Sequence, residues 1–259
     1  MKKLLLLSSL LVASIWFVGC TENTTDPTPD PTPTYFPVKT NSNYVLKVEW
    51  LKPDQTVDFS YQDSIVLGST FTLAGKQAVR GYRWGNDAST GMKRIFDSIP
   101  QSNDGEAAWY YMSPVSFQGL STYTIPEQWC KLGDFNLTSS STSWVVYNDT
   151  IPSIPVTLGG QTLQATDVAV NQTVTKIADT TISYKGASVV VKRTMIRSTI
   201  NATLMGQQIP PIVVEEYAGF AQNIGRILFY RNSSTINLGV TTAPIAGFRY
   251  TLQSHTIAN

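Results

Sequence analysis

The chain has 259 residues, with 19 basic and 18 acidic side chains and a formal net charge of +1 at pH 7. No basic patch stands out, so the composition argues against a nucleic-acid partner. One histidine and two cysteines are too few ligands for a usual zinc site, and we expect neither a metal nor a cofactor.

The first 20 residues have the pattern of an export signal. A basic start precedes the apolar run Leu4–Val18, which is too short for a good membrane span. The segment Phe17-Val18-Gly19-Cys20 resembles the lipobox of bacterial lipoproteins, in which the cysteine thiol is acylated. That resemblance implies a signal peptide over residues 1–19 and a lipid such as palmitate on Cys20. The alternative is an uncleaved anchor that ends in an ordinary cysteine.

Residues 20–34 are predicted to be the lipidated cysteine and an extended tether. After Cys20 the sequence reads TENTTDPTPDPTPT, and its alternating Pro and Thr favour polyproline II. Such a tether reaches about 40 Å and would hold a folded domain clear of the lipid surface. Thr21, rather than Asp, follows the cysteine. By resemblance to the sorting rule of lipoproteins, this implies the outer membrane over the inner one, with the periplasmic or surface face left open.

Residues 35–259 are predicted to form a single β domain. Thr, Val, Ile, Tyr and Ser dominate this part of the chain, and apolar and polar residues alternate with period two. A first hairpin is predicted from Tyr44–Trp50 and Val57–Tyr61, joined by a turn at Lys52–Gln55.

A second hairpin is predicted over Ile154–Ala165. Gly159-Gly160 suits a two-residue loop with positive φ, which places Val156 opposite Leu163. Ala187–Leu204 is too long for one ordinary strand unless the sheet is strongly curved or the strand carries a bulge. Further turns are predicted at residues 74–76, 185–186 and 205–206, and further strands at Ile212–Tyr217, Gly225–Arg231 and Phe248–Ile257.

One short helix is predicted over Thr124–Gly133. Thr124 and Glu127 fit a capping box, and Pro126 sits early in the segment. The sequence therefore predicts an all-β fold, or a mostly β fold with one or two short helices. We expect a strongly curved antiparallel sheet that forms a half-barrel or open barrel, and a β-sandwich is the alternative.

The two ends of the domain resemble a group of bacterial lipoproteins. Tyr35–Val38 and Asn43–Leu46 resemble their opening pattern YFPL…G..W.Y, with Tyr44 where tryptophan is common. Tyr217-Ala218 and Asn223–Ile227 resemble their later YA…VG.V strand. The resemblance implies a bent sheet similar to the half-barrels of periplasmic lipoprotein carriers, with a concave apolar face for an acyl chain. It implies no catalytic residues.

Few residues suggest catalysis. His255 is the single imidazole, and we expect it at the surface or at a strand edge. Cys130 is expected to be a buried apolar residue. Glu215 and Glu216 point to opposite faces of a strand, so they form no dyad. One is expected to face solvent and the other to pair with a basic group such as Arg193 or Arg197. Asn103–Glu106 is expected to be a plain turn rather than a calcium site.

Aromatic side chains are the best candidates for a ligand site. They suit the core of a curved sheet, a groove for an apolar ligand, or a stacking platform for sugar rings. The residues predicted to bind a ligand are Trp50, Trp84, Trp109, Tyr111 and Trp144.

These features predict a lipid-anchored, non-enzymatic protein of the cell envelope. Its leading function is to bind a lipid or another hydrophobic ligand on a concave apolar face. A surface-exposed adhesion or glycan-binding protein is the alternative. An envelope hydrolase, the third hypothesis, would have to use His255. The oligomeric state is left open.

Overall fold

The computed structural model describes residues 34–86, 93–114, 125–158, 161–237 and 242–258. These residues lie in one compact unit, Pro33–Asn259. The expected signal peptide, Cys20 and the tether up to residue 33 lie outside the described residues. In the ranges described, no helix is both long and apolar enough to cross a membrane.

The described chain forms β-strands joined by turns and loops. In chain order the strands are β1 (Asn43–Leu51), β2 (Val57–Leu73), β3 (Lys76–Asn86), β4 (Lys93–Asn103), β5 (Ala107–Met112), β6 (Gln128–Asp134), β7 (Ser143–Leu158), β8 (Gln161–Tyr184), β9 (Ala187–Leu204), β10 (Gln207–Gln208), β11 (Ile212–Ala221), β12 (Gly225–Arg231), β13 (Ser234–Asn237), β14 (Thr242–Ile245) and β15 (Gly247–Thr256).

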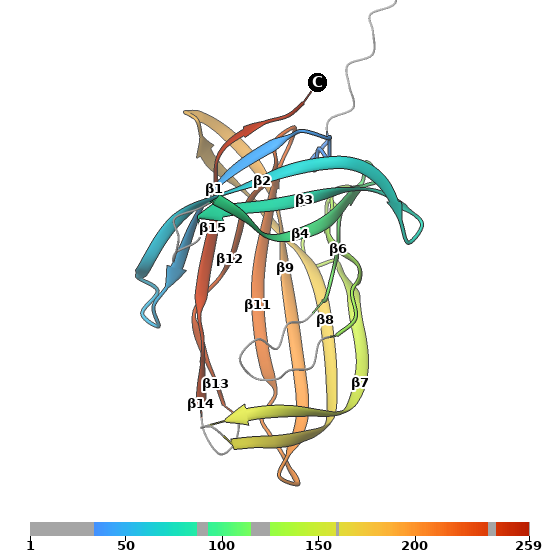
Figure 1. Ribbon diagram of the computed structural model, residues 1–259, viewed down its shortest axis with the longest axis vertical. Coiled ribbons are helices and arrows are strands. Elements are labelled where there is room, and N and C mark those ends of the chain that lie inside the picture. The colour runs from blue at the N-terminus through green and yellow to red at the C-terminus, as the bar shows by residue number, and fades with distance from the viewer. Residues whose placement is uncertain (1–33, 87–92, 115–124, 159–160, 238–241, 259) are drawn as a thin grey trace, which may run out of the picture. The chain divides into compact units, whose positions relative to one another are not determined.

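One 13-stranded antiparallel sheet makes up most of the fold. Its order is β6-β5-β4-β3-β2-β1-β15-β12-β11-β9-β8-β7, with β10 paired to β9, while β13 and β14 form a separate ribbon. Figure 1 shows β2, β3 and β4 crossing the upper part of the molecule, and β8, β9 and β11 running down its length. The sheet is nearly closed into a barrel. The predicted all-β fold with a strongly curved sheet is confirmed.

Both predicted hairpins are confirmed, the second with its predicted register, although its Gly159-Gly160 turn lies outside the described residues. Trp50 pairs with Phe59 across β1 and β2, and Val156 pairs with Leu163 across β7 and β8. Two-residue turns with positive φ match the right-handed twist of the strands that they join. Three predicted turns have this geometry, at Ala74-Gly75, Lys185-Gly186 and Met205-Gly206.

The longest strand pair is β8 with β9, of 24 and 18 residues. One continuous strand spans Ala187–Leu204, a length that we expected only for a strongly curved sheet or a bulged strand. The irregularities lie on its partner β8, between Thr166 and Ala169 and between Ile177 and Thr180. Bulges increase local twist and bend a strand, so they let this pair follow the curvature of the barrel.

The predicted helix over Thr124–Gly133 is wrong. Gln128–Asp134 forms strand β6, which pairs with β5, and Thr124 lies outside the described residues. Cys130 and Leu132 are buried, whereas Lys131 between them is partly exposed, a period of two. A capping interaction stabilises a helix by only about 1 kcal/mol, so strand pairing and burial of alternate side chains outweigh it.

Three buried apolar clusters form the core. The first includes side chains of β7, β8, β9 and β11, and its member Val168 is fully buried. The second joins β5 and β6 to β8, β9 and β11, with Tyr110 and Phe220 among its largest members. The third packs Leu46 of β1 together with Val191 near the tip of the β8–β9 hairpin. The core thus ties the crossing upper strands to the long ones.

The barrel has a seam where its two edge strands, β6 and β7, face each other. Within the described residues these strands share no backbone ladder. Side chains span the gap instead: Gln128 Nε2 donates to the Val146 carbonyl at 2.9 Å, and Trp144 Nε1 donates to the Lys131 carbonyl at 2.8 Å. Pro152 and Pro155 lie on the β7 edge, and proline removes donors that another strand needs.

Candidate ligand-binding cavity

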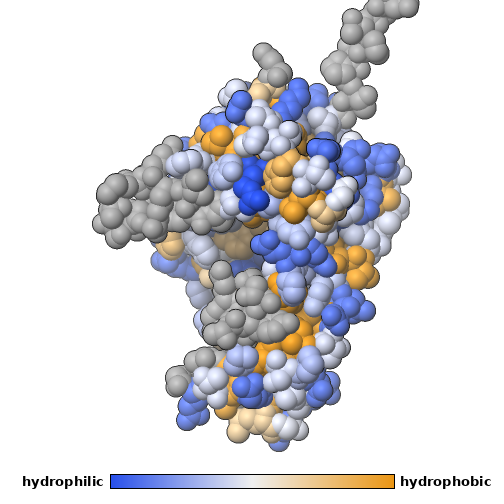
Figure 2. Space-filling view, turned by 45° about the vertical axis from the view of Figure 1, so that its right-hand side comes forward, coloured by the Kyte–Doolittle hydropathy of each residue, from blue (hydrophilic) through white to orange (hydrophobic). Residues whose placement is uncertain are grey.

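A cavity of about 170 Å³ lies on the concave face of the sheet. It is surrounded by β1 to β6, β12 and β15, and its apolar wall includes Leu46, Ile65, Ile99, Met112, Phe229 and Phe248. Figure 2 shows a hollow with hydrophobic surface inside it on one face of the molecule. A cavity of about 150 Å³ lined by Leu, Ile and Phe binds benzene. A ring, or a stretch of alkyl chain, therefore fits in this space.

Strand register explains why these side chains converge. Ile65 pairs with Arg83 across β2 and β3, and Gln101 pairs with Tyr110 across β4 and β5. Directly paired residues share a face of the sheet, so all four point to the concave side and line the cavity. Gly81 adds room, because a Cβ atom there would lie 2.3 Å from Gln101 Nε2.

Aromatic rings continue from the cavity wall to the molecular surface. Phe248, which lines the cavity, lies 6.3 Å from Trp50, and Trp50 stacks on Phe59 at 6.1 Å between ring centroids. Phe59 stacks in turn on Tyr61 at 6.3 Å. The Phe59 side chain is 53% exposed. We call these four residues the aromatic strip, and it extends the apolar surface of the cavity outward.

A buried ion pair stands at the edge of the cavity. Arg83 Nε donates to Asp63 Oδ2 at 2.6 Å, and the Asp63 side chain is fully buried. Arg83 also donates to the Tyr61 hydroxyl at 3.3 Å, and its guanidinium lies 5.6 Å from the Tyr250 ring centroid. The second oxygen of Asp63, Oδ1, has no hydrogen-bond partner among the described residues. The charge of Arg83 is thus matched by a carboxylate inside the fold.

A second arginine in the wall has a different environment. The guanidinium carbon of Arg226 lies 5.1 Å from the Tyr110 ring and 5.2 Å from the Phe229 ring. Burial raises the pKa of Tyr110, and the charge of Arg226 opposes that shift. The Gln101 side chain lies in the same wall and is 7% exposed. Both polar groups therefore reach the apolar cavity.

The five aromatic residues predicted from the sequence do not gather at this cavity. Trp50 belongs to the aromatic strip. Trp84 follows the cavity-lining Arg83 on β3 and therefore points to the opposite face. Tyr111 packs edge-on against Trp129 at 5.3 Å. Trp144 lies at the seam and packs against the second core cluster. Their ligand-binding role stays a prediction.

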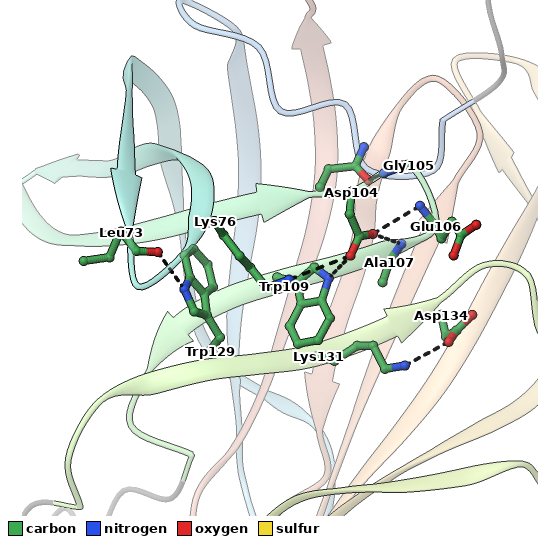
Figure 3. Close-up of polar contacts among 11 residues, drawn as sticks. Leu73, Lys76, Asp104, Gly105, Glu106, Ala107, Trp109, Trp129, Lys131 and Asp134 are labelled. Carbon is green, nitrogen blue, oxygen red and sulfur yellow. Dashed lines mark hydrogen bonds and ion pairs between the residues drawn. The ribbon is translucent and has the colours of Figure 1, made fainter.

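Trp109 lies on the outer face of β5, where Asp104 holds it (Figure 3). Its indole Nε1 donates to Asp104 Oδ2 at 2.7 Å, and Lys76 Nζ lies 3.8 Å from the ring centroid. The Ala107 amide donates to the other oxygen of Asp104 at 2.9 Å. Asp104 lies in Asn103–Glu106, which connects β4 to β5.

Asp104 gives the fold a defined acid dependence. Partial burial disfavours its ionisation, but hydrogen bonds from Trp109 and from backbone amides, with the charge of Lys76, hold its pKa below the usual value. The folded state therefore binds this proton less readily than the unfolded chain. Asp104 stabilises the fold above its unfolded pKa of about 3.9, and this contribution is lost as pH falls through the lower folded pKa.

We expect Asp104→Asn to lower the free energy of unfolding modestly at neutral pH and to leave it less dependent on acid. Urea unfolding, compared for wild type and variant at neutral pH and at a pH below 4, measures both effects. The same difference between the two proteins at both pH values would contradict the assignment.

The residues considered for catalysis have structural partners. His255 Nδ1 lies 2.8 Å from the Tyr184 hydroxyl, and burial, then the charge of Lys185, lower its pKa. Cys130 is buried as predicted, and burial raises the pKa of its thiol to about 12. One of the two neighbouring glutamates was expected to pair with an arginine, and both do. Glu215 pairs with Arg197 at 3.7 Å, and Glu216 pairs with Arg231 at 3.2 Å.

Sequence analysis missed the polar residues of the cavity. The sequence patterns place Arg226 in a strand without assigning it a role, and no local pattern singles out Arg83 or Gln101. One signal was present for Arg226, because it directly precedes the apolar and aromatic run Ile227–Tyr230. Its position beside Tyr110 follows from the order of strands far apart in the chain, which no local pattern specifies.

No protein-family model matches the chain, and no curated protein matches it in sequence. Two solved structures are similar to it. One is a provisionally assigned lipoprotein from Parabacteroides distasonis, with 11% identity, a TM-score of 0.47, and coverage of 87% of this chain and 100% of the other. The second is a provisionally assigned exported protein with a YmcC-like fold from Bacteroides fragilis, with 10% identity, a TM-score of 0.41, and coverage of 86% and 99%. The resemblance seen at the two ends of the domain stays a prediction.

Proposed function

We propose that the chain is a lipid-anchored, non-enzymatic protein of the cell envelope that binds a lipid or other hydrophobic ligand inside its curved sheet. The observation that carries this proposal is the continuity of the cavity with the aromatic strip. Phe248 belongs to both, and Phe59 at the outer end is 53% exposed. The anchor and the outer-membrane location rest on the lipobox resemblance around Cys20 and on Thr21 after it.

An elongated ligand suits this surface better than a compact one. The cavity, with a volume of about 170 Å³, holds only part of a long chain, and the rest would lie along Trp50 and Phe59. Each methylene removed from water contributes about 0.8 kcal/mol. An alkyl chain gains that energy over its whole length, and it covers rings that otherwise face solvent.

Photo-crosslinking tests the proposed site. The full chain, extracted from membranes and kept in amphipol, is incubated with a long-chain alcohol that carries a diazirine, then irradiated and digested. We expect label on peptides from β12 and β15. Ile99→Trp places a large ring in the cavity and is expected to lower labelling about tenfold. Val190→Trp adds the same ring at an exposed position, where the native side chain is 55% exposed, and should label as wild type does.

Equal labelling of the two tryptophan variants would contradict the cavity as the site. Absence of label from wild type would contradict a hydrophobic ligand altogether. The stacked, exposed rings of Phe59 and Tyr61 also suit a sugar ring, which is the second candidate function. Slower hydrogen exchange of β2 in the presence of added oligosaccharide, together with no uptake of the alcohol, would favour that alternative.

A further inference from the structure

The cavity wall contains a cation, Arg226, for which the described residues supply no matching anion. Arg83 pairs with Asp63, Arg197 with Glu215, and Arg231 with Glu216. Arg226 differs, because among the described residues its guanidinium has no carboxylate within ion-pair distance and no hydrogen bond. It lies between the rings of Tyr110 and Phe229, which offer attraction to a cation but no acceptor oxygen. A partly buried guanidinium in this setting favours an anion that enters from outside.

An amide accompanies this cation. The Gln101 side chain is 7% exposed and, in the part of the chain described, makes no hydrogen bond. Its NH₂ group can donate to an oxygen in the cavity. A guanidinium and an amide donor in one wall suit a carboxylate or a phosphate, whose oxygens accept several charge-assisted hydrogen bonds.

The polar pair lies at one end of the cavity. A small adjoining void of about 20 Å³ is lined by Arg226 and Gln101 together with Phe36 and Tyr44, but not by Phe248. Phe248 lies at the opposite end, where the aromatic strip begins. Arg226 and Gln101 therefore lie at the end of the cavity away from the aromatic strip, which we call the inner end, whereas the paired Arg83 lies near Tyr61 of the strip.

We propose that the cavity binds a single-chain amphiphile with an anionic head group, which Arg226 and Gln101 hold at the inner end while the alkyl chain runs past Phe248 toward Trp50. This inference rests on the proposed function and specifies its ligand class. A single chain is favoured because the cavity volume, about 170 Å³, leaves no room for two chains side by side. Arg226 is then the residue that selects an anion over a neutral lipid.

Equilibrium binding of two matched probes tests the role of the charge. Radiolabelled dodecanoate and dodecanol have the same chain length and differ at the head group. Each is titrated at neutral pH against the full chain in amphipol, with protein-free amphipol as the blank. We expect wild type to bind dodecanoate at least tenfold more tightly than dodecanol. We expect dodecyl phosphate to bind as dodecanoate does, whereas free acetate and inorganic phosphate, which lack the chain, leave dodecanoate bound.

Variants separate the charge from the packing. Arg226→Met keeps a long apolar side chain between the two rings and is expected to weaken dodecanoate binding about 10- to 100-fold, with dodecanol affinity unchanged. Arg226→Lys retains the charge and should keep most of the preference. Arg197→Met removes the same charge from an exposed pair on the outer face and should have no effect on either probe.

The outcomes distinguish the two proposals. Equal affinity of wild type for dodecanoate and dodecanol overturns the anion-binding inference and leaves the hydrophobic site in place. Absence of binding by both probes overturns the proposed function as well. Dodecanol affinity and thermal unfolding show whether Arg226→Met is folded. If it is not, the comparison of dodecanoate with dodecanol in wild type and in Arg226→Lys still tests whether the cavity selects an anion. Displacement of dodecanoate by inorganic phosphate alone would also contradict an amphiphile.

Discussion

Replacing Arg83 by methionine is expected to lower the free energy of unfolding by about 3–5 kcal/mol, because it leaves a buried carboxylate without its counter-ion. The Asp63 side chain is fully buried, and one of its two oxygens already lacks a partner among the described residues. The hydrogen bond from Arg83 Nε to Asp63, at 2.6 Å, is therefore the main interaction that offsets the cost of burying this carboxylate. Urea unfolding of wild type and variant measures the loss.

A double replacement shows whether the loss comes from the unpaired charge. Asp63→Leu combined with Arg83→Met removes both charges, and an apolar pair of similar size is often as stable as a buried ion pair. We expect the double variant to recover most of the loss. Arg197→Met, which breaks the exposed pair with Glu215, should cost less than about 1 kcal/mol. A double variant as unstable as Arg83→Met alone would contradict the explanation.

Replacing Cys20 by serine is expected to remove the chain from the outer-membrane fraction and to abolish incorporation of labelled palmitate. The serine hydroxyl does not replace the thiol that accepts the lipid, and stable anchoring depends on buried acyl chains at about 0.8 kcal/mol per methylene. Fractionation of cells grown with radiolabelled palmitate, followed by immunoblotting, measures both effects.

Cys130→Ala is the matched control for the lipidation test. Cys130 is the other cysteine of the chain, and it is fully buried against β5. The Cys130→Ala variant should therefore keep both the label and the membrane location. Loss of label from this variant instead, or unchanged fractionation of Cys20→Ser, would contradict a lipid on Cys20.

Local signals predicted the hairpins well. The glycine pair at Gly159-Gly160 and the alternation around it were enough to pair Val156 with Leu163. Strand β12 was predicted with its observed bounds, Gly225–Arg231. In each case the information lies within a dozen residues, so it depends little on the rest of the fold.

Competing local signals explain the error at β6. Thr124, Pro126 and Glu127 have the spacing of a helix start, yet Cys130 and Leu132 alternate with partly exposed residues, as in a strand. Helix and strand patterns are hard to separate in a segment this short. Pairing with β5 favours the strand over the helix here, because it satisfies the backbone of β6 and buries Cys130 beside Tyr110.

The cavity was beyond local prediction for another reason. The sequence pointed to an apolar concave face, but its candidates were chosen by aromatic character. None of the five lines the cavity, and Trp50 alone lies in the adjoining aromatic strip. Arg226 meets Tyr110 only because β12 and β5, on opposite halves of the sheet, face each other across the barrel. Such a meeting depends on strand order and curvature, which are properties of the whole chain.

The seam between β6 and β7 is the place where the barrel can widen at the lowest cost in free energy. Parting any other two neighbours in the main sheet breaks a row of peptide-to-peptide bonds. Moving β6 away from β7 breaks side-chain bonds instead, those of Gln128 and Trp144 and the bond from Thr194 of β9 to the Leu132 carbonyl, together with the packing beside them. We therefore expect a guest bulkier than the resting interior to be accommodated by separation of β6 from β7, with the hydrogen-bonded ladders of the rest of the sheet kept intact.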